Sequence, residues 1–157
     1  MKIQHGNVLN ISQGIVVHGC NAQGQMKSGI AGEIHQRFLS VYEDYHRCYT
    51  QGALVLGSVI YSPPNTKENR GFWVANGITQ EFYGRDPHVR YVDYVAIRYV
   101  FKNVYEHAKK MNLDVNFPKI GAGLANGSWD VISQIISQEL KDVPHTLWLH
   151  ENAQPLQ

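Results

Sequence analysis

One segment near the start of this chain joins a buried strand to a helix through a long glycine-rich loop. It reads Ile15-Val16-Val17-His18-Gly19-Cys20-Asn21-Ala22-Gln23-Gly24-Gln25-Met26-Lys27-Ser28-Gly29-Ile30-Ala31-Gly32. The apolar run 15–18 lies between two glycines, which is typical of a short buried strand. The loop glycines let the backbone approach a ligand closely. Because the loop opens a helix, its free N–H groups and the helix dipole favour a bound anion.

A second loop of the same kind reads Pro118-Lys119-Ile120-Gly121-Ala122-Gly123-Leu124-Ala125-Asn126-Gly127. Two such loops on one sheet can hold a diphosphate from both sides with backbone donors, whereas either loop alone could simply be a tight turn. No G-x-x-x-x-G-K-[ST] motif is present, which excludes a P-loop nucleotidase. The run 121–123 does not begin a Rossmann fingerprint, because Asn126 stands where the third glycine belongs.

The rest of the chain alternates predicted strands with predicted helices. Strands are expected at 2–4 (an edge strand), 15–18, 54–61, 72–76, 114–117 and 145–149, with a surface loop at 62–70. Helices are expected at 29–38, 93–111 and 129–140, with Asp93 and Ser128 as N-caps of the last two. This order predicts an α/β domain whose mostly parallel sheet is covered on both faces. Such sheets bind ligands at the carboxyl ends of their strands.

Composition narrows the classes of protein. The chain has 157 residues, the length of one domain, and its 14 Lys and Arg against 13 Asp and Glu give a net charge of +1. A sequence-specific nucleic-acid binder would carry a strong basic excess, so none is expected. We find no apolar run of about 20 residues and no signal peptide. We therefore expect a cytoplasmic protein without a membrane partner, with Cys20 and Cys48 as reduced thiols and no metal site.

At the two loops the sequence resembles the macrodomain, the ADP-ribose-binding fold. The first loop is similar to Asn-x-Gln-Gly-x-Met-x-x-Gly-Ile-Ala, and the second to Pro-x-Ile-Gly-x-Gly-Leu followed by Trp, here Trp129. The segment Ala75-Asn76-Gly77-Ile78-Thr79-Gln80, with Tyr83-Gly84, resembles a branch that includes ADP-ribose 1″-phosphate phosphatases and the terminal ADP-ribose–protein glycohydrolase. The resemblance spans residues 5–149. It implies a three-layer α/β/α sandwich with a mixed, mostly parallel sheet.

The resemblance also implies a set of ligand-binding residues and no cofactor. One loop would line the diphosphate through Gly29, Ile30 and Ala31, and the other through Gly121, Ala122, Gly123, Leu124 and Ala125. Asn21 would hydrogen-bond the distal ribose or, alternatively, brace the loop. Asn7 stands where the family has an Asp that accepts from the adenine amino group; its amide oxygen can still accept, or it can be a turn residue. The remaining positions assigned to the ligand are Val8 and Gln23.

The chemistry is less uniform than the fold within this family. One branch uses a Lys nucleophile and an Asp, but the matching positions here are Gln80 and Ala125, so that mechanism is rejected. The remaining catalytic candidates are His18, expected to point near the distal ribose as a general acid or base, and Asn21, which would orient the ribose. The alternative for His18 is a hydrogen-bonded histidine packed under the loop. Cys20 has no partner in the sequence that marks it as a nucleophile.

Taken with these residues, the resemblance implies a metal-independent hydrolase that converts ADP-ribose 1″-phosphate to ADP-ribose and phosphate. Two alternatives stay open: a non-catalytic ADP-ribose reader, and a hydrolase that removes ADP-ribose from protein or nucleic acid, with ADP-ribosylated macromolecules as partners. The expected organisation is a single monomeric domain over residues 1–152, followed by a flexible tail at 153–157. Phe82, Tyr83 or the run His150-Glu151-Asn152 could cover the adenine.

Overall fold

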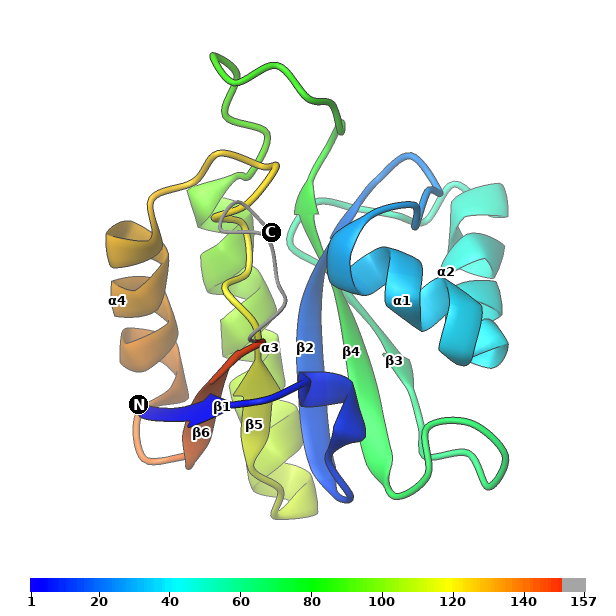
Figure 1. The fold of residues 1–157 in the computed structure, drawn as a ribbon, viewed down its shortest axis with the longest axis vertical. Helices are drawn as coiled ribbons and strands as arrows, with labels where there is room; N and C mark the ends of the chain where they lie inside the picture. Colours follow the sequence, from blue (N-terminus) through cyan, green and yellow to red (C-terminus); the bar gives the residue numbers. More distant parts are fainter. Residues whose placement is uncertain (151–157) are drawn as a thin grey trace.

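The computed structural model describes residues 1–150, in which a six-stranded sheet lies between two pairs of helices (Figure 1). The strands are β1 (Lys2–His5), β2 (Gly14–Asn21), β3 (Val59–Ser62), β4 (Phe72–Gln80), β5 (Val115–Phe117) and β6 (His145–Leu149). Their order is β1-β6-β5-β2-β4-β3, and every neighbouring pair is parallel except β3 with β4. The predicted α/β sandwich with a mixed, mostly parallel sheet is confirmed.

Each face of the sheet has its own hydrophobic core. The helices α1 (Gly29–Arg37) and α2 (Leu39–Thr50) cover one face, and α3 (Tyr94–Met111) and α4 (Trp129–Leu140) cover the other (Figure 1). Side chains alternate along β2, so that Ile15 and Val17 join the core with α3 and α4, while Val16 joins the core with α1 and α2. This burial on both faces explains the continuous apolar run that predicted the strand.

Both predicted helix N-caps are present. The Asp93 carboxylate accepts a hydrogen bond from the Ala96 N–H at 2.9 Å, and the Ser128 hydroxyl accepts one from the Val131 N–H at 3.4 Å. These caps satisfy backbone donors that the first turns of α3 and α4 would otherwise leave without partners.

Four elements differ from the prediction. The helix α2 was not among the predicted helix ranges, the strand expected at 54–61 spans Val59–Ser62 instead, and β2 and β4 run on to Asn21 and Gln80. A turn occupies the start of the predicted strand, where Ser58 N–H donates to the Val55 carbonyl at 3.0 Å and Gly57 has a φ of +88°. The apolar run 54–56 therefore belongs to a connection, and the register of the sheet begins only at Val59.

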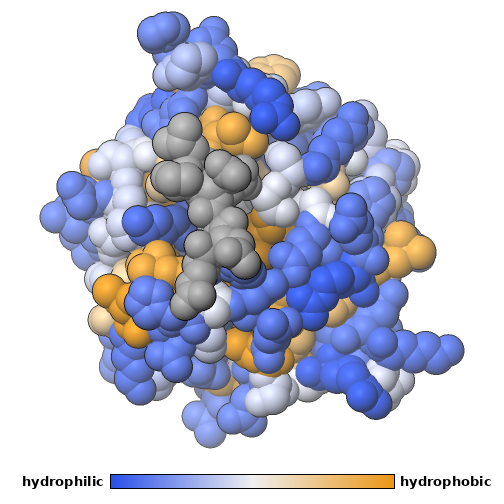
Figure 2. All heavy atoms as spheres, viewed as in Figure 1, coloured by the Kyte–Doolittle hydropathy of each residue, from blue (hydrophilic) through white to orange (hydrophobic). Residues whose placement is uncertain are grey.

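The face of the molecule seen in Figure 2 is mostly hydrophilic. None of the helices within residues 1–150 combines the length and the apolar character that crossing a membrane requires. A short 3-10 helix, η1 (Val8–Asn10), follows β1. The predicted tail at 153–157, and positions 151–152 of the predicted domain, lie outside the described residues.

Candidate ligand-binding site

A pocket of about 810 Å³ lies where the carboxyl ends of the parallel strands meet. Its wall includes Asn21 at the end of β2, Gln80 at the end of β4, Pro118 directly after β5 and Leu149 at the end of β6. The pocket thus crosses four strands of the sheet, as expected for a ligand site in an open α/β fold. Its volume lies in the range of about 300–1,000 Å³ that is usual for cofactor-sized ligands.

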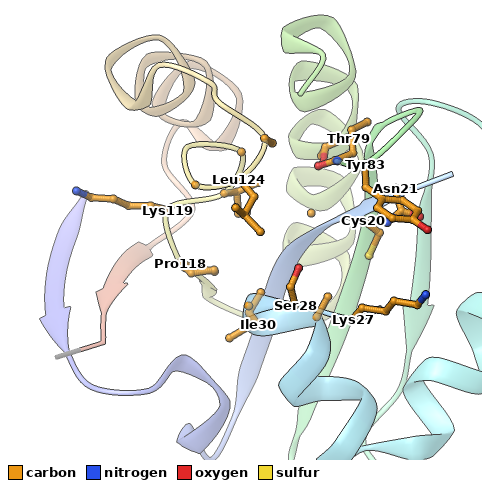
Figure 3. Close-up of a pocket in the computed structure, with 18 of the residues that line it drawn as sticks. Cys20, Asn21, Lys27, Ser28, Ile30, Thr79, Tyr83, Pro118, Lys119 and Leu124 are labelled. Carbon is orange, nitrogen blue, oxygen red and sulfur yellow. The ribbon is translucent and has the colours of Figure 1, made fainter. Parts of the chain in front are cut away.

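The two glycine-rich loops form facing walls of this pocket. In Figure 3, Pro118 and Leu124 approach from one side, and Ser28 and Ile30 approach from the other. Of the nine predicted diphosphate and ribose contacts on the two loops, the structure places all but Ala122 at the pocket: Asn21, Gly29, Ile30, Ala31, Gly121, Gly123, Leu124 and Ala125. The sequence motifs are therefore brought together across β2 and β5.

The first wall is the N-terminus of α1. Ser28 occupies the N-cap position, but its side chain makes no capping hydrogen bond, and the first turn contains no acidic residue. The first N–H that bonds within the helix is that of Gly32, which donates to the Ser28 carbonyl at 3.1 Å. The N–H groups of Gly29, Ile30 and Ala31 consequently have no intrahelical acceptor, and the positive end of the helix dipole lies at the pocket.

The second wall presents further backbone donors. Gly121 has a φ of +75°, and the turn it forms is closed by the Gly127 N–H, which donates to the Gly121 carbonyl at 2.7 Å. Within the described part of the chain, the N–H groups of Gly123, Leu124 and Ala125 donate no hydrogen bond. Two sets of three unpaired N–H groups thus line one pocket, an arrangement suited to an anion.

Asn21 is held firmly at the end of β2. Its Oδ1 accepts from the Gln23 N–H at 2.9 Å, and its Nδ2 donates to the Gln25 carbonyl at 2.9 Å. The Tyr45 hydroxyl donates to the Asn21 backbone carbonyl at 2.6 Å and also lies 3.0 Å from Asn21 Oδ1. Asn21 therefore braces the loop, and one N–H of its side-chain amide stays available to a ligand in the pocket.

His18 lies beneath the pocket and does not line it. Its side chain is fully buried, and its Nε2 lies 2.6 Å from Asn76 Oδ1. The expectation that it points toward the distal ribose needs correction, because β2 continues three residues past His18, which pairs with Asn76 inside the sheet. Asn76 Nδ2 donates to the Ile60 carbonyl at 2.9 Å, so Asn76 Oδ1 is the acceptor and His18 Nε2 carries the proton.

The environment keeps His18 and its neighbour Cys20 neutral. Burial lowers the pKa of the His18 imidazole from 6.5 to about 4, although the hydrogen bond with Asn76 opposes this shift. Burial also raises the pKa of the Cys20 thiol far above its usual range. Cys20 lines the pocket with its Sγ 3.5 Å from His18 Nε2, and both Cys20 and Cys48 are free thiols. A protonated, buried thiol is a poor nucleophile.

Four of the predicted ligand residues do not line the pocket: Asn7, Val8, Gln23 and Ala122. Asn7 is the N-cap of η1, and its Oδ1 accepts from the Leu9 N–H at 2.9 Å. Val8 is buried in the core with α1 and α2. Gln23 Nε2 donates to the Glu81 carbonyl at 3.1 Å, so its amide ties the first loop to the segment after β4.

Other pocket residues were not among the predicted contacts. They include Glu33, Thr79, Trp148, Lys27, Arg85 and Lys119. Figure 3 shows the Lys27 and Lys119 side chains extending in opposite directions, and both residues are exposed. Thr79 and Trp148 are the next-to-last residues of β4 and β6, at the carboxyl ends that face the pocket, so the carboxyl-end rule could have found them. Across residues 1–150, no three His, Cys, Asp or Glu side chains are grouped so that they could hold a metal ion.

The fold and this site define the class of protein. The Macro domain family model matches residues 17–136, and the chain belongs to this family. The ADP-ribose 1″-phosphate phosphatase of Debaryomyces hansenii is 25% identical over 146 residues, which cover 79% of this chain and 82% of that protein.

Two solved structures extend this comparison. A Bacteroides thetaiotaomicron protein of unknown function superposes with a TM-score of 0.81 at 27% identity, covering 94% of this chain and 98% of the other. The Thermosipho africanus DarTG structure in complex with ADP-ribose gives a TM-score of 0.78 at 16% identity, covering 98% of this chain and 43% of the other. The second likeness is one of fold.

Proposed function

We propose that this chain binds ADP-ribose in the pocket between its two glycine-rich loops. The observation that carries this proposal is the convergence of unpaired N–H groups from Gly29–Ala31 and Gly123–Ala125 on one pocket. Backbone donors can hold a doubly anionic diphosphate without a cluster of Lys or Arg side chains. This agrees with a chain whose net charge is only +1. The complex of a structural relative with ADP-ribose supports the same ligand.

Calorimetry with ADP-ribose tests the proposal, using a variant that changes the charge of the first wall. Ile30→Glu places a carboxylate in the first turn of α1, where it would repel the diphosphate, and we expect affinity to fall by about tenfold or more. Val95→Glu is the matched control, because Val95 is likewise the second residue of its helix, α3, and lies outside the pocket. Absence of binding by the unmodified chain would refute the proposal.

A second candidate is hydrolysis of ADP-ribose 1″-phosphate, which the name of the Debaryomyces hansenii relative favours. In this candidate the loop N–H groups would stabilise charge that develops on the phosphate during the reaction. Because the His18 imidazole is buried and bonded to Asn76, we assign it to positioning Cys20 and the pocket floor rather than to proton transfer. Phosphate release from the 1″-phosphate tests this candidate, and binding without release would select a reader.

The monomeric state stays a prediction, which sedimentation would test.

A further inference from the structure

The segment 81–91, which we call the arch, leaves the carboxyl end of β4 and leads back toward α3 (Figure 1, green at the top). Gln80 and Val92 pair with each other in antiparallel fashion and close its base. Three consecutive residues of the arch line the pocket: Tyr83, Gly84 and Arg85. The arch therefore forms the pocket wall at the end of β4.

The arch is fastened to both glycine-rich loops. On the side of the first loop, Gln23 Nε2 donates to the Glu81 carbonyl at 3.1 Å. On the side of the second loop, Asn126 Nδ2 donates to the Asp86 carbonyl at 2.9 Å and to the Val89 carbonyl at 2.6 Å. Asn126 has a φ of +61°, a conformation that asparagine adopts more readily than most residues. These bonds hold an exposed segment in a defined position at the pocket.

The middle of the arch packs on the Tyr91 hydroxyl. This oxygen accepts a hydrogen bond from the Asp86 N–H at 3.2 Å, and a Cβ on Gly84 would collide with it. The close approach requires glycine at position 84, since any side chain there would push the arch away from Tyr91. Arg85, the next residue, is thereby placed at the pocket.

Arg85 brings an unpaired positive charge to the pocket. Its guanidinium forms no hydrogen bond or ion pair within residues 1–150, whereas the guanidinium of Arg90 lies 4.2 Å from the centre of the Tyr94 ring. Two acidic residues of the arch lie outside the pocket wall: Glu81 and Asp86. Glu33, an acidic residue that does line the pocket, is paired with Arg37 at 2.7 Å. Arg85 is therefore available to an anionic group of the ligand.

The neighbours of Arg85 in the wall are polar. Asn21 and Gln80 line the pocket at this end, together with the buried Thr79 hydroxyl, and Figure 3 shows Thr79, Tyr83 and Asn21 on one side of the pocket. The two glycine-rich loops follow β2 and β5, whereas the arch follows β4 at the side of β2 away from β5. Arg85 thus lies to one side of the N–H groups that we assign to the diphosphate, among groups that suit the hydroxyls of a ribose.

We propose that the Arg85 guanidinium binds a phosphate group on the terminal ribose, so that the pocket selects ADP-ribose derivatives with a second anion at C1″. The inference rests on the proposed binding of ADP-ribose and names the substrate class within it. A guanidinium can donate two parallel hydrogen bonds to a phosphate, which adds geometric fit to the attraction of charge. Unsubstituted ADP-ribose would offer Arg85 only hydroxyl groups. Asn126 acts as a positioning residue, because it holds the arch that carries Arg85.

Calorimetry at low salt with two ligands tests the proposal. One ligand is ADP-ribose, and the other carries a methylenephosphonate at C1″, in which a CH₂ group replaces the bridging oxygen so that no phosphate can be released. We expect the unmodified chain to bind the phosphonate about tenfold more tightly than ADP-ribose. Arg85→Gln should bring this affinity ratio close to one without changing the affinity for ADP-ribose. Arg85→Lys keeps the charge but not the planar fork, and should retain part of the ratio.

Arg90→Gln is the matched control, because it removes the same charge from a position on the arch outside the pocket wall and should leave the ratio unchanged. Asn126→Gly tolerates the positive φ but loses both bonds to the arch, and should lower the ratio partially. A ratio that Asn126→Gly leaves intact would overturn its positioning role. Circular dichroism of each variant shows that a lost ratio does not come from a lost fold.

The outcomes separate this inference from the proposed function. Equal affinity of the unmodified chain for the two ligands, or a ratio that Arg85→Gln leaves intact, overturns the role of Arg85 while ADP-ribose binding stands. Equal weakening of both ligands by Arg85→Gln also overturns it, because the guanidinium would then act on the diphosphate that both ligands share. Failure of the unmodified chain to bind either ligand refutes the proposed function itself.

Discussion

His18 Nε2 and Asn76 Oδ1 lie 2.6 Å apart in the middle of the sheet, where β2 and β4 pair in parallel register. Both side chains are fully buried, and Asn76 is anchored by its bond to the Ile60 carbonyl on β3. The bond therefore links three strands below the pocket floor. A neutral imidazole satisfies it, whereas a protonated one would place an unpaired charge in the core.

The stability of the protein should depend on pH through His18. Its pKa is about 4 in the folded protein and 6.5 without the fold, so between these values the unfolded chain binds the proton more readily. The contribution of neutral His18 to the free energy of unfolding should therefore be present in full above pH 6.5, and it should be lost as the pH falls toward 4. The loss attributable to His18 is about 3 kcal/mol. Urea denaturation at several pH values measures it.

The control for this prediction is a side chain that keeps the hydrogen bond but does not titrate. His18→Gln can still donate to Asn76, and its stability should change less with pH than that of the unmodified chain. His88→Gln removes an exposed histidine and should leave the pH dependence as it was. Parallel stability curves for the unmodified chain and His18→Gln would contradict a depressed pKa at His18.

A second prediction concerns the turn at Gly121, whose φ is +75°. A Cβ there would lie 2.8 Å from Val92 Cγ2 and 3.0 Å from Ile132 Cδ1, both in the core. Gly121→Ala should lower the free energy of unfolding by about 2–3 kcal/mol, through backbone strain and overpacking together. It should also weaken ADP-ribose binding, because the loop must shift. Urea denaturation and calorimetry measure the two effects.

Gly52 separates the two causes, since its φ is +69° and a Cβ there meets nothing within 4 Å. Gly52→Ala should therefore cost only the backbone term, about 1 kcal/mol, and leave ligand binding unchanged. Equal costs at the two positions would mean that the second loop moves freely and that its shape is not set by contact with Val92 and Ile132.

The sequence predicted the sheet, the two loops and eight of the residues with which these loops line the pocket, because these features depend on local signals. A continuous apolar run, glycines at a strand end and helix caps such as Asp93 are all visible in a short window of sequence. The helix α2 lacks such signals: its buried residues are only Val41 and Tyr45, and aromatic and β-branched residues weaken its intrinsic helix propensity. Its packing against α1 stabilises it, as in the stacked rings of His35 and Tyr42.

The details of the site that sequence reasoning missed depend on contacts between distant positions. Asn7 and Glu33 are 26 positions apart, and nothing in the sequence shows that one amide holds the other's carboxylate. His18 was misplaced because the end of β2 was set three residues too early. The strand continues to Asn21 because β4 extends alongside it to Gln80, a tertiary effect that overrides the glycine at position 19.

The last prediction concerns Thr79, whose hydroxyl is buried at the pocket without a hydrogen-bond partner among the described residues. An unpaired buried hydroxyl costs free energy, so Thr79→Val should leave stability unchanged or raise it by up to about 1 kcal/mol. If the Thr79 hydroxyl forms a hydrogen bond with the ligand, the same variant should weaken ADP-ribose affinity by about threefold to tenfold. Thermal unfolding and calorimetry on one preparation measure both.

Ser62 supplies the opposite case on the neighbouring strand. Its buried hydroxyl donates to Asp44 Oδ2 at 2.7 Å and lies outside the pocket, so Ser62→Ala should lose about 1 kcal/mol of stability without any change in affinity. The two variants thus predict a crossed pattern, in which one hydroxyl contributes to binding and the other to folding. Undiminished affinity in Thr79→Val would show that the Thr79 hydroxyl does not contact the ligand, because a methyl group can neither donate nor accept the hydrogen bond that the hydroxyl would make.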